Sequence, residues 1–297
     1  MFRHFLTAAG GLLAVFPSAA VAADAQPYDW TGFYAGIFGS GSRDRFTATG
    51  DLQINQISGL FVNNRGIVIV PGTTRTFAVP ARIHYILAGA QIGYRAQSGR
   101  FVFGGEADFD PFARDVAAFS GQVLPQTALS PQVTIGSQRN FRLSREWSIR
   151  GRAGIAFGHT LAYATGGYAS ARVGVVGFDS FNNPGGPAAP CTPNCQANLG
   201  PEGPVLTIAN ELHTMAGWTA GIGADQAIGH HFSIGLEYRH SDFGTKTFTL
   251  ANQVVQNLGP ETHGDNGGTG LLGSVSTGPN RVSVRTDAIA LRVNYRF

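Results

Sequence analysis

The sequence has little charge and no long apolar run beyond its N-terminal end. Asp, Glu, Lys and Arg together make up only 13% of its 297 residues. After the N-terminus no window of 18 or more residues is apolar throughout, which excludes a transmembrane helix there. Low charge is nevertheless typical of a chain that is buried or faces lipid. A closed barrel fits both observations, because its strands alternate apolar and polar residues.

Cysteine is also scarce, with two residues in the chain. Cys191 and Cys195 lie in the Pro-rich stretch PAAPCTPNCQA. In an oxidising compartment we expect a disulfide within this loop, which would stiffen the loop and add little to a core. A metal site needs more ligands than two thiols, and no His or acidic residue is nearby. We therefore expect no metal here.

Basic residues do not cluster, and the formal net charge is only +3. This pattern does not favour nucleic-acid binding. Residues 1–22 instead have the features of a secretory signal peptide. Arg3 and His4 precede an apolar core from Phe5 to Val15, and Ala20-Val21-Ala22 offers a small-x-small cleavage site. We expect an exported protein with a cleaved signal peptide and a single mature domain, residues 23–297.

Eight segments of the mature chain alternate apolar and polar side chains with the period of two that is typical of β-strands. In Val282–Phe297, for example, Ile289 to Phe297 contribute every second residue to an apolar face, while Arg292 and Asn294 lie on the other. The eight segments cover residues 30–42, 83–97, 100–110, 145–157, 161–176, 214–228, 232–243 and 282–297.

Short and long connections between these segments alternate strictly. Tight turns are expected at residues 98–99, 158–160 and 229–231, whereas the other four connections have roughly 30–40 residues each. Bacterial outer-membrane barrels show the same asymmetry, with tight periplasmic turns and long external loops. The sequence thus predicts an all-β, eight-stranded antiparallel up-and-down transmembrane β-barrel with four long extracellular loops.

Charged residues within the strands are expected to face the barrel interior. A charge on the lipid face at mid-depth costs roughly 2–4 kcal/mol. The predicted interior residues are Arg95, Glu106, Asp108, Arg150, Arg152, Glu237, Arg239 and Arg292. They can form a salt-bridged plug, since eight strands leave an interior that side chains can fill. The alternative is a gate or constriction with a mild preference for anions.

Several motifs resemble one known family. WTGFYAG, GAQIGYRAQSGRFVFGGEADFD, SIRGRAGIAF, GWTAGIGAD, SIGLEYRHSDFG and the terminal LRVNYRF are similar to the alphaproteobacterial small outer-membrane β-barrel proteins. These are porin-like surface antigens related to OmpA-type and opacity-type barrels. The resemblance implies a place in the outer membrane. By resemblance to that class, Tyr295 and Phe297 are expected to form the carboxy-terminal signal that the barrel assembly machinery recognises.

An enzyme is the least favoured interpretation. His240, Asp242 and Ser283 lie toward the outer rim, where a Ser/His/acid triad would be placed in a lipid-modifying barrel. Polar residues leaving the membrane explain the same pattern more simply. We expect no catalytic residues and no cofactor.

Two functions remain. One is a structural or surface-interaction protein with a charged, largely plugged lumen, and the other is a small porin for passive diffusion of small solutes. The expected partners are outer-membrane lipid and lipopolysaccharide, the assembly machinery, and host or ligand molecules that the loops contact.

Overall fold

The computed structural model describes residues 28–60, 67–70, 73–124, 133–182, 205–249, 253–257 and 272–297. The predicted signal peptide and both cysteines lie outside these ranges. None of the described residues belongs to a helix that is long and apolar enough to cross a membrane. The described strands are β1 (Gly32–Leu60), β2 (Ile67–Val70), β3 (Thr73–Ser98), β4 (Phe101–Asp110), β5 (Arg114–Leu124), β6 (Val133–Phe157), β7 (Thr160–Asn182), β8 (Val205–Ile228), β9 (Phe232–Phe248), β10 (Gln253–Asn257), β11 (Leu272–Thr277) and β12 (Asn280–Arg296).

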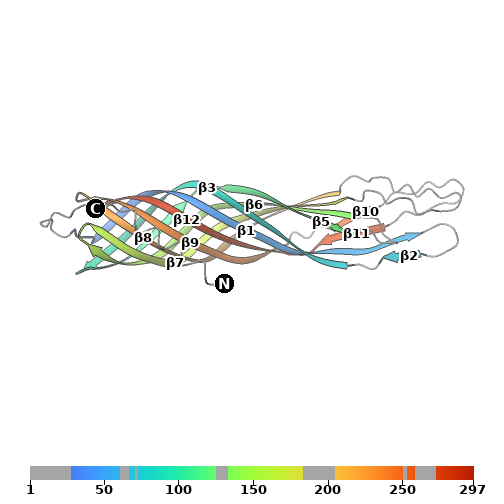
Figure 1. Ribbon diagram of the computed structural model, residues 1–297, viewed down its shortest axis with the longest axis horizontal. Coiled ribbons are helices and arrows are strands. Elements are labelled where there is room, and N and C mark those ends of the chain that lie inside the picture. Colours follow the sequence, from blue (N-terminus) through green and yellow to red (C-terminus); the bar gives the residue numbers. More distant parts are fainter. Residues whose placement is uncertain are drawn as a thin grey trace.

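Eight of these strands pair in a closed ring in the order β1, β12, β9, β8, β7, β6, β4 and β3. The last strand closes against the first, with antiparallel pairs from Tyr34↔Arg296 to Thr49↔Arg281. The other edge of β1 pairs with β3, from Gly32↔Arg95 to Ile54↔Thr73, and this pairing completes the ring. Figure 1 shows the ring strands slanting around one long axis, with the carboxyl terminus at one end. The predicted all-β, antiparallel up-and-down barrel is confirmed.

Three tight turns join β3 to β4, β6 to β7 and β8 to β9, where the sequence analysis placed them. Each contains a glycine in the left-handed region, Gly99 at φ 59°, Gly158 at φ 59° and Gly229 at φ 64°. Glycine adopts this conformation without the steric cost that a Cβ would add. The sequence of each turn therefore explains why the chain reverses there.

The long connections differ from the prediction. The ring strands continue into segments that we expected to be loops, and β1 alone has 29 residues. The short strands β2, β5, β10 and β11 pair beyond the ring path, so the described sheet has twelve strands instead of eight. In Figure 1 these four lie toward the end opposite the carboxyl terminus. The extended strands carry the barrel well past the span of about 9–11 residues that a bilayer requires.

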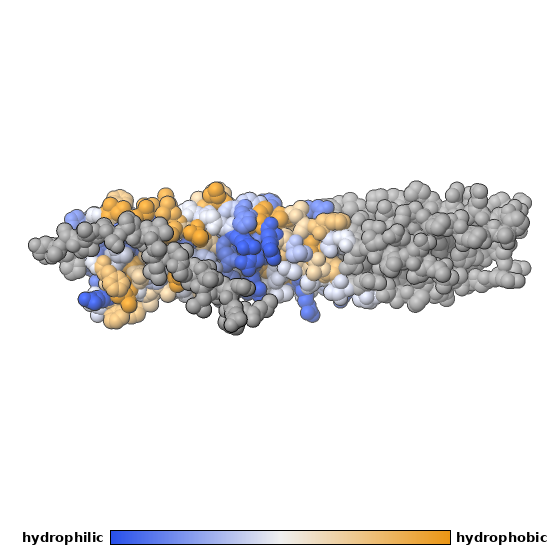
Figure 2. Space-filling model, viewed as in Figure 1, coloured by the Kyte–Doolittle hydropathy of each residue, from blue (hydrophilic) through white to orange (hydrophobic). Residues whose placement is uncertain are grey.

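The two faces of the strands exchange character along their length. Near the tight turns the outward residues are apolar, and Ile37, Phe103 and Ile149 are 67%, 56% and 59% exposed. Further from the turns the outward residues are polar, as at Arg43 and Arg82. Figure 2 shows apolar residues gathered over the part of the molecule nearer the carboxyl terminus, with a strongly hydrophilic group beyond them. The apolar stretch of each strand marks the membrane-spanning segment.

The interior consists of three successive layers. A small apolar cluster lies near the tight turns, and it contains Trp30, Val102 and Leu161. Buried charged residues follow along the same strands. A larger apolar cluster then fills the part of the barrel where the outer face is polar. That cluster consists of Phe46, Ala48, Phe77, Val79, Ala81, Phe141, Leu143, Ala169, Ala171, Val173, Val175, Met215, Phe243, Phe248, Val282 and Val284.

Candidate functional site

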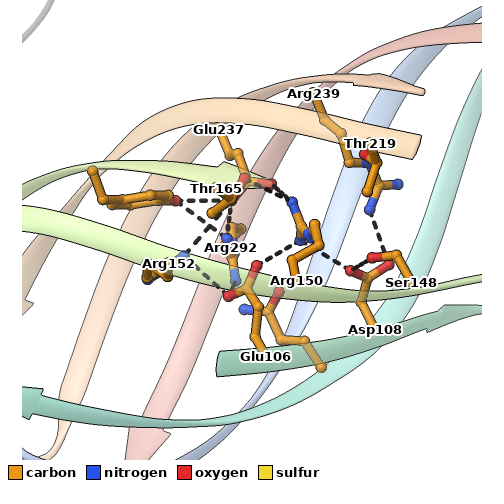
Figure 3. A network of polar contacts seen from close by, with 12 residues as sticks. Glu106, Asp108, Ser148, Arg150, Arg152, Thr165, Thr219, Glu237, Arg239 and Arg292 are labelled. Carbon is orange, nitrogen blue, oxygen red and sulfur yellow. Dashed lines mark hydrogen bonds and ion pairs between the residues drawn. The ribbon is translucent and has the colours of Figure 1, made fainter. Parts of the chain in front are cut away.

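Six of the eight strands of the ring direct charged side chains into the middle layer of the interior. All eight residues that the alternation predicted to face inward are buried. Arg95 comes from β3, while β4, β6, β9 and β12 supply the others, namely Glu106, Asp108, Arg150, Arg152, Glu237, Arg239 and Arg292. Figure 3 shows most of them converging on one another from different strands. β8 adds Asp225, which the sequence analysis did not identify.

Glu106 lies at the centre of this network. Its Oε1 is 2.6 Å from Nη2 of Arg150, the residue directly opposite on β6. Its Oε2 is 2.6 Å from Nη2 of Arg292 and 3.1 Å from Nη2 of Arg152. The hydroxyl of Tyr34 donates a further hydrogen bond of 2.7 Å to Oε2. Three guanidinium groups therefore surround one carboxylate, as buried charge requires.

Glu237 connects the same arginines from the other side of the interior. Arg150 Nη1 donates to its Oε1 at 2.5 Å. Arg292 Nη1 and the hydroxyl of Tyr163 both donate to its Oε2, the latter at 3.0 Å. Arg150 and Arg292 thus both bridge Glu106 and Glu237. Charge-assisted bonds of this kind are roughly twice as strong as neutral ones, and the shared donors make the network cooperative.

Asp108 and Asp225 extend the network along the barrel axis in opposite directions. Asp108 accepts hydrogen bonds of 2.9 Å from both Arg150 and Arg239. Asp225 accepts from Arg95 Nη2 at 2.9 Å and from Arg152 Nη1 at 2.8 Å. Asp225 was missed because its neighbours in GWTAGIGAD are small. Its position in the alternation could nevertheless have predicted that it faces inward, since it shares the inward face of β8 with Thr219 and Gly221.

A second ionic cluster lies between the charged layer and the large apolar cluster. Arg114 of β5 is 1% exposed and contacts three carboxylates. Its Nε, Nη1 and Nη2 are 2.6, 3.0 and 2.5 Å from oxygens of Asp44, Asp110 and Glu146. Arg114 lies in a stretch whose sequence predicts a loop, so its burial was not expected.

The triad considered for an enzyme is not assembled. His240 Nδ1 lies 2.7 Å from Oδ1 of Asp287, and Asp242 pairs instead with Arg285 at 2.9 Å. Ser283 lies four residues before Asp287 on β12, which places it roughly 13 Å from Asp287, the partner of His240, along an extended strand. The hydrogen bond from His240, followed by one from Tyr238, lowers the pKa of the Asp287 carboxyl. Among the described residues no group of three or more His, Cys, Asp or Glu side chains could hold a metal ion.

Tyr295 and Phe297 lie at the rim next to the tight turns. Their rings meet edge to face with centroids 5.3 Å apart, and the two side chains point outward. The backbone N–H of Phe297 donates a 3.0 Å hydrogen bond to the carbonyl oxygen of Phe33 on β1. The chain end is thus held against the first strand of the ring.

Comparison with known proteins identifies relatives for this barrel. The family model described as "Outer membrane protein beta-barrel domain" matches residues 11–297. The 31 kDa outer-membrane immunogenic proteins of Brucella melitensis biotype 1 and Brucella suis biovar 1 are each 26% identical over 239 residues, which are 77% of this chain and 78% of each relative.

Solved structures add a weaker likeness. Ail of Yersinia pestis, solved with the heparin analogue sucrose octasulfate, is 10% identical with a TM-score of 0.31 over 86% of this chain and 99% of Ail. The outer membrane protease OmpT of Escherichia coli is 9% identical with a TM-score of 0.32 over 88% of this chain and 97% of OmpT. Such low scores carry no argument about activity. The family match is decisive: this chain belongs to the outer membrane protein β-barrel family, related to surface antigens, and resides in the cell outer membrane.

Proposed function

We propose that this outer-membrane barrel is a closed structural or surface-interaction protein and does not conduct solutes. The observation that carries the proposal is the burial of inward-facing side chains in three successive layers. The middle layer holds Glu106, Glu237 and their arginines with almost no exposure. Paired charges of this kind satisfy one another and need no water-filled channel.

The large apolar cluster supports closure independently of the charged layer. Phe46 and Phe141 stack with ring centroids 5.1 Å apart, and both are 1% exposed. A hydrated ion passing this layer would lose its water without gaining a polar partner, which is unfavourable. The alternative, a small porin, would have to open both layers. We propose that the arginines serve as structural ion-pair partners and do not form a gate.

Liposome swelling distinguishes the two functions. We expect folded protein in lipid vesicles to give no swelling in isotonic sugar solutions, because neither layer leaves a path. A general porin reconstituted at the same protein-to-lipid ratio serves as the positive control. Swelling whose rate falls as the sugar becomes larger would establish the porin and refute closure.

The partners follow from this arrangement. We propose that the end of the barrel away from the tight turns projects from the cell surface and contacts host or ligand molecules. The tight turns would then face the periplasm, as is general for such barrels. We propose no catalytic activity, since His240 is engaged with Asp287 and not with a nucleophile. Outer-membrane lipid and lipopolysaccharide surround the apolar belt in this proposal.

Tyr295 and Phe297 are proposed as the signal that the barrel assembly machinery recognises. Deletion of Phe297 removes one ring of the pair and the hydrogen bond to Phe33. We expect this deletion to reduce the heat-modifiable protein in outer-membrane fractions several-fold. Phe157→Ala is a matched control, because Phe157 is also exposed beside a tight turn but lies on β6. Normal outer-membrane levels of the deletion variant would refute the signal.

A further inference from the structure

A groove opens on the lipid-facing surface where β3, β1, β12 and β9 lie side by side. Cross-strand register places Ile86, Gly41, Ile289 and Tyr238 in one row across these four strands. The groove has a volume of about 450 Å³. Gly41 forms its floor, while Ile86 (91% exposed) stands at one side and Ile289 at the other. The groove lies at the edge of the apolar belt that is farther from the tight turns.

Nothing in the fold requires glycine at the floor of the groove. A Cβ built on Gly41 would meet no atom within 4 Å, and one on Gly39 would approach only the carbonyl oxygen of Leu87, at 3.9 Å. Neither glycine has a positive φ. Larger apolar residues would bury well against lipid at both positions. The missing side chain of Gly41 therefore leaves the groove open, although the backbone does not require glycine there.

Basic side chains border the groove on the side away from the tight turns. Arg43 lies beside His84, and one step further Arg45 lies directly opposite both Arg82 and Arg285. Like charges placed directly opposite on neighbouring strands are destabilising. Three arginines side by side on an outer surface therefore cost the fold free energy that a bound anion would recover.

The neighbouring carboxylates neutralise only part of this charge. Arg45 forms an ion pair with Asp287, and Arg285 forms one with Asp242 at 2.9 Å. For Arg43 and Arg82, no ion-pair partner is present in the part of the chain that the structure describes. Both guanidinium groups are exposed just beyond the apolar belt. This is the depth at which the phosphates of membrane lipids lie.

We propose that this groove binds one phosphorylated glycolipid of the outer leaflet, with an acyl chain over Gly41 and a phosphate at the arginine row. The groove supplies apolar contact for the chain. The planar guanidinium groups match phosphate oxygens in a bidentate manner. The inference rests on the membrane placement in the proposed function, but it does not depend on whether the lumen conducts.

The test uses the folded full-length chain in a non-ionic detergent, with purified bisphosphorylated lipid A as the probe. Bound lipid is measured by native mass spectrometry. We expect the wild type to bind this probe about tenfold more tightly than dephosphorylated lipid A, because the phosphate adds charge-assisted bonds. Arg45→Gln combined with Arg82→Gln should remove most of that preference. Equal binding of the two lipids by the wild type would overturn the proposal.

The floor of the groove is tested separately. Gly41→Leu fills the groove and should weaken binding of both lipid A forms about tenfold. Gly151→Leu is the matched control, because Gly151 faces outward on β6 and its Cβ would meet only a carbonyl oxygen at 3.8 Å. Heat-modifiable migration confirms that each variant is folded. Equal losses in the two leucine variants would overturn the groove. Phosphatidylglycerol that binds as tightly as lipid A, with the same dependence on the variants, would overturn the assignment to a glycolipid.

Discussion

Replacing Arg292 by alanine is expected to lower the free energy of unfolding by about 3–5 kcal/mol. Arg292 is 1% exposed and bridges Glu106 and Glu237. Its removal leaves two buried carboxylates, Glu106 and Glu237, with one donor fewer each. The cost comes mainly from the charges left behind. Urea unfolding of the refolded protein in detergent, followed by gel migration, measures the change.

A surface arginine provides the control for this variant. Arg285 also contacts a carboxylate, Asp242, but its side chain is 57% exposed. Exposed pairs of this kind contribute about 0–1 kcal/mol. Arg285→Ala should therefore shift the unfolding midpoint little. Comparable shifts for Arg285→Ala and Arg292→Ala would show that the interior network is hydrated, contrary to the proposed closure.

Replacing Phe141 by alanine is expected to cost about 3–5 kcal/mol through a different mechanism. Phe141 is 1% exposed and stacks on Phe46 inside the large apolar cluster. Alanine removes the ring and leaves a cavity that a closed ring of strands cannot collapse easily. The loss combines the transfer free energy of the ring with the cavity term. The same urea titration measures it.

Phe119 of β5 is the matched control for Phe141. It is 67% exposed on the outer face, so Phe119→Ala should change the free energy of unfolding by roughly 0.5 kcal/mol or less. A loss below about 1 kcal/mol for Phe141→Ala would indicate that water already fills this part of the barrel. The apolar layer would then offer no barrier to solutes.

Alternation within the strands was sufficient to predict the membrane-spanning part. Glu106 and Arg150 were assigned to the interior because their neighbours Phe103 and Ile149 are apolar and out of phase with them. A charge that faces lipid is so costly that the charged residues of such a strand can face only the interior. The three tight turns were equally predictable, since each has a glycine, such as Gly158, between two alternating segments, and that glycine adopts the left-handed conformation that the turn needs.

The part of the barrel beyond the membrane could not be predicted in the same way. There the apolar residues face inward, as at Phe77 and Val79, and polar residues face out. A search for outward apolar rows misses such strands, because the alternation persists while the faces exchange roles. Arg114 was missed for the same reason. Its burial depends on Asp44 of β1 and Glu146 of β6, which are 70 and 32 residues away in the sequence.

Single-channel recording in planar bilayers tests the closed interior most directly. The folded wild type should give no current steps, and Arg150→Ala combined with Arg152→Ala should also stay silent, because the apolar layer around Phe46 and Phe141 remains intact. Reproducible steps in the wild type would contradict the account. Steps that appear only in the double arginine variant would assign the seal to a charged gate instead.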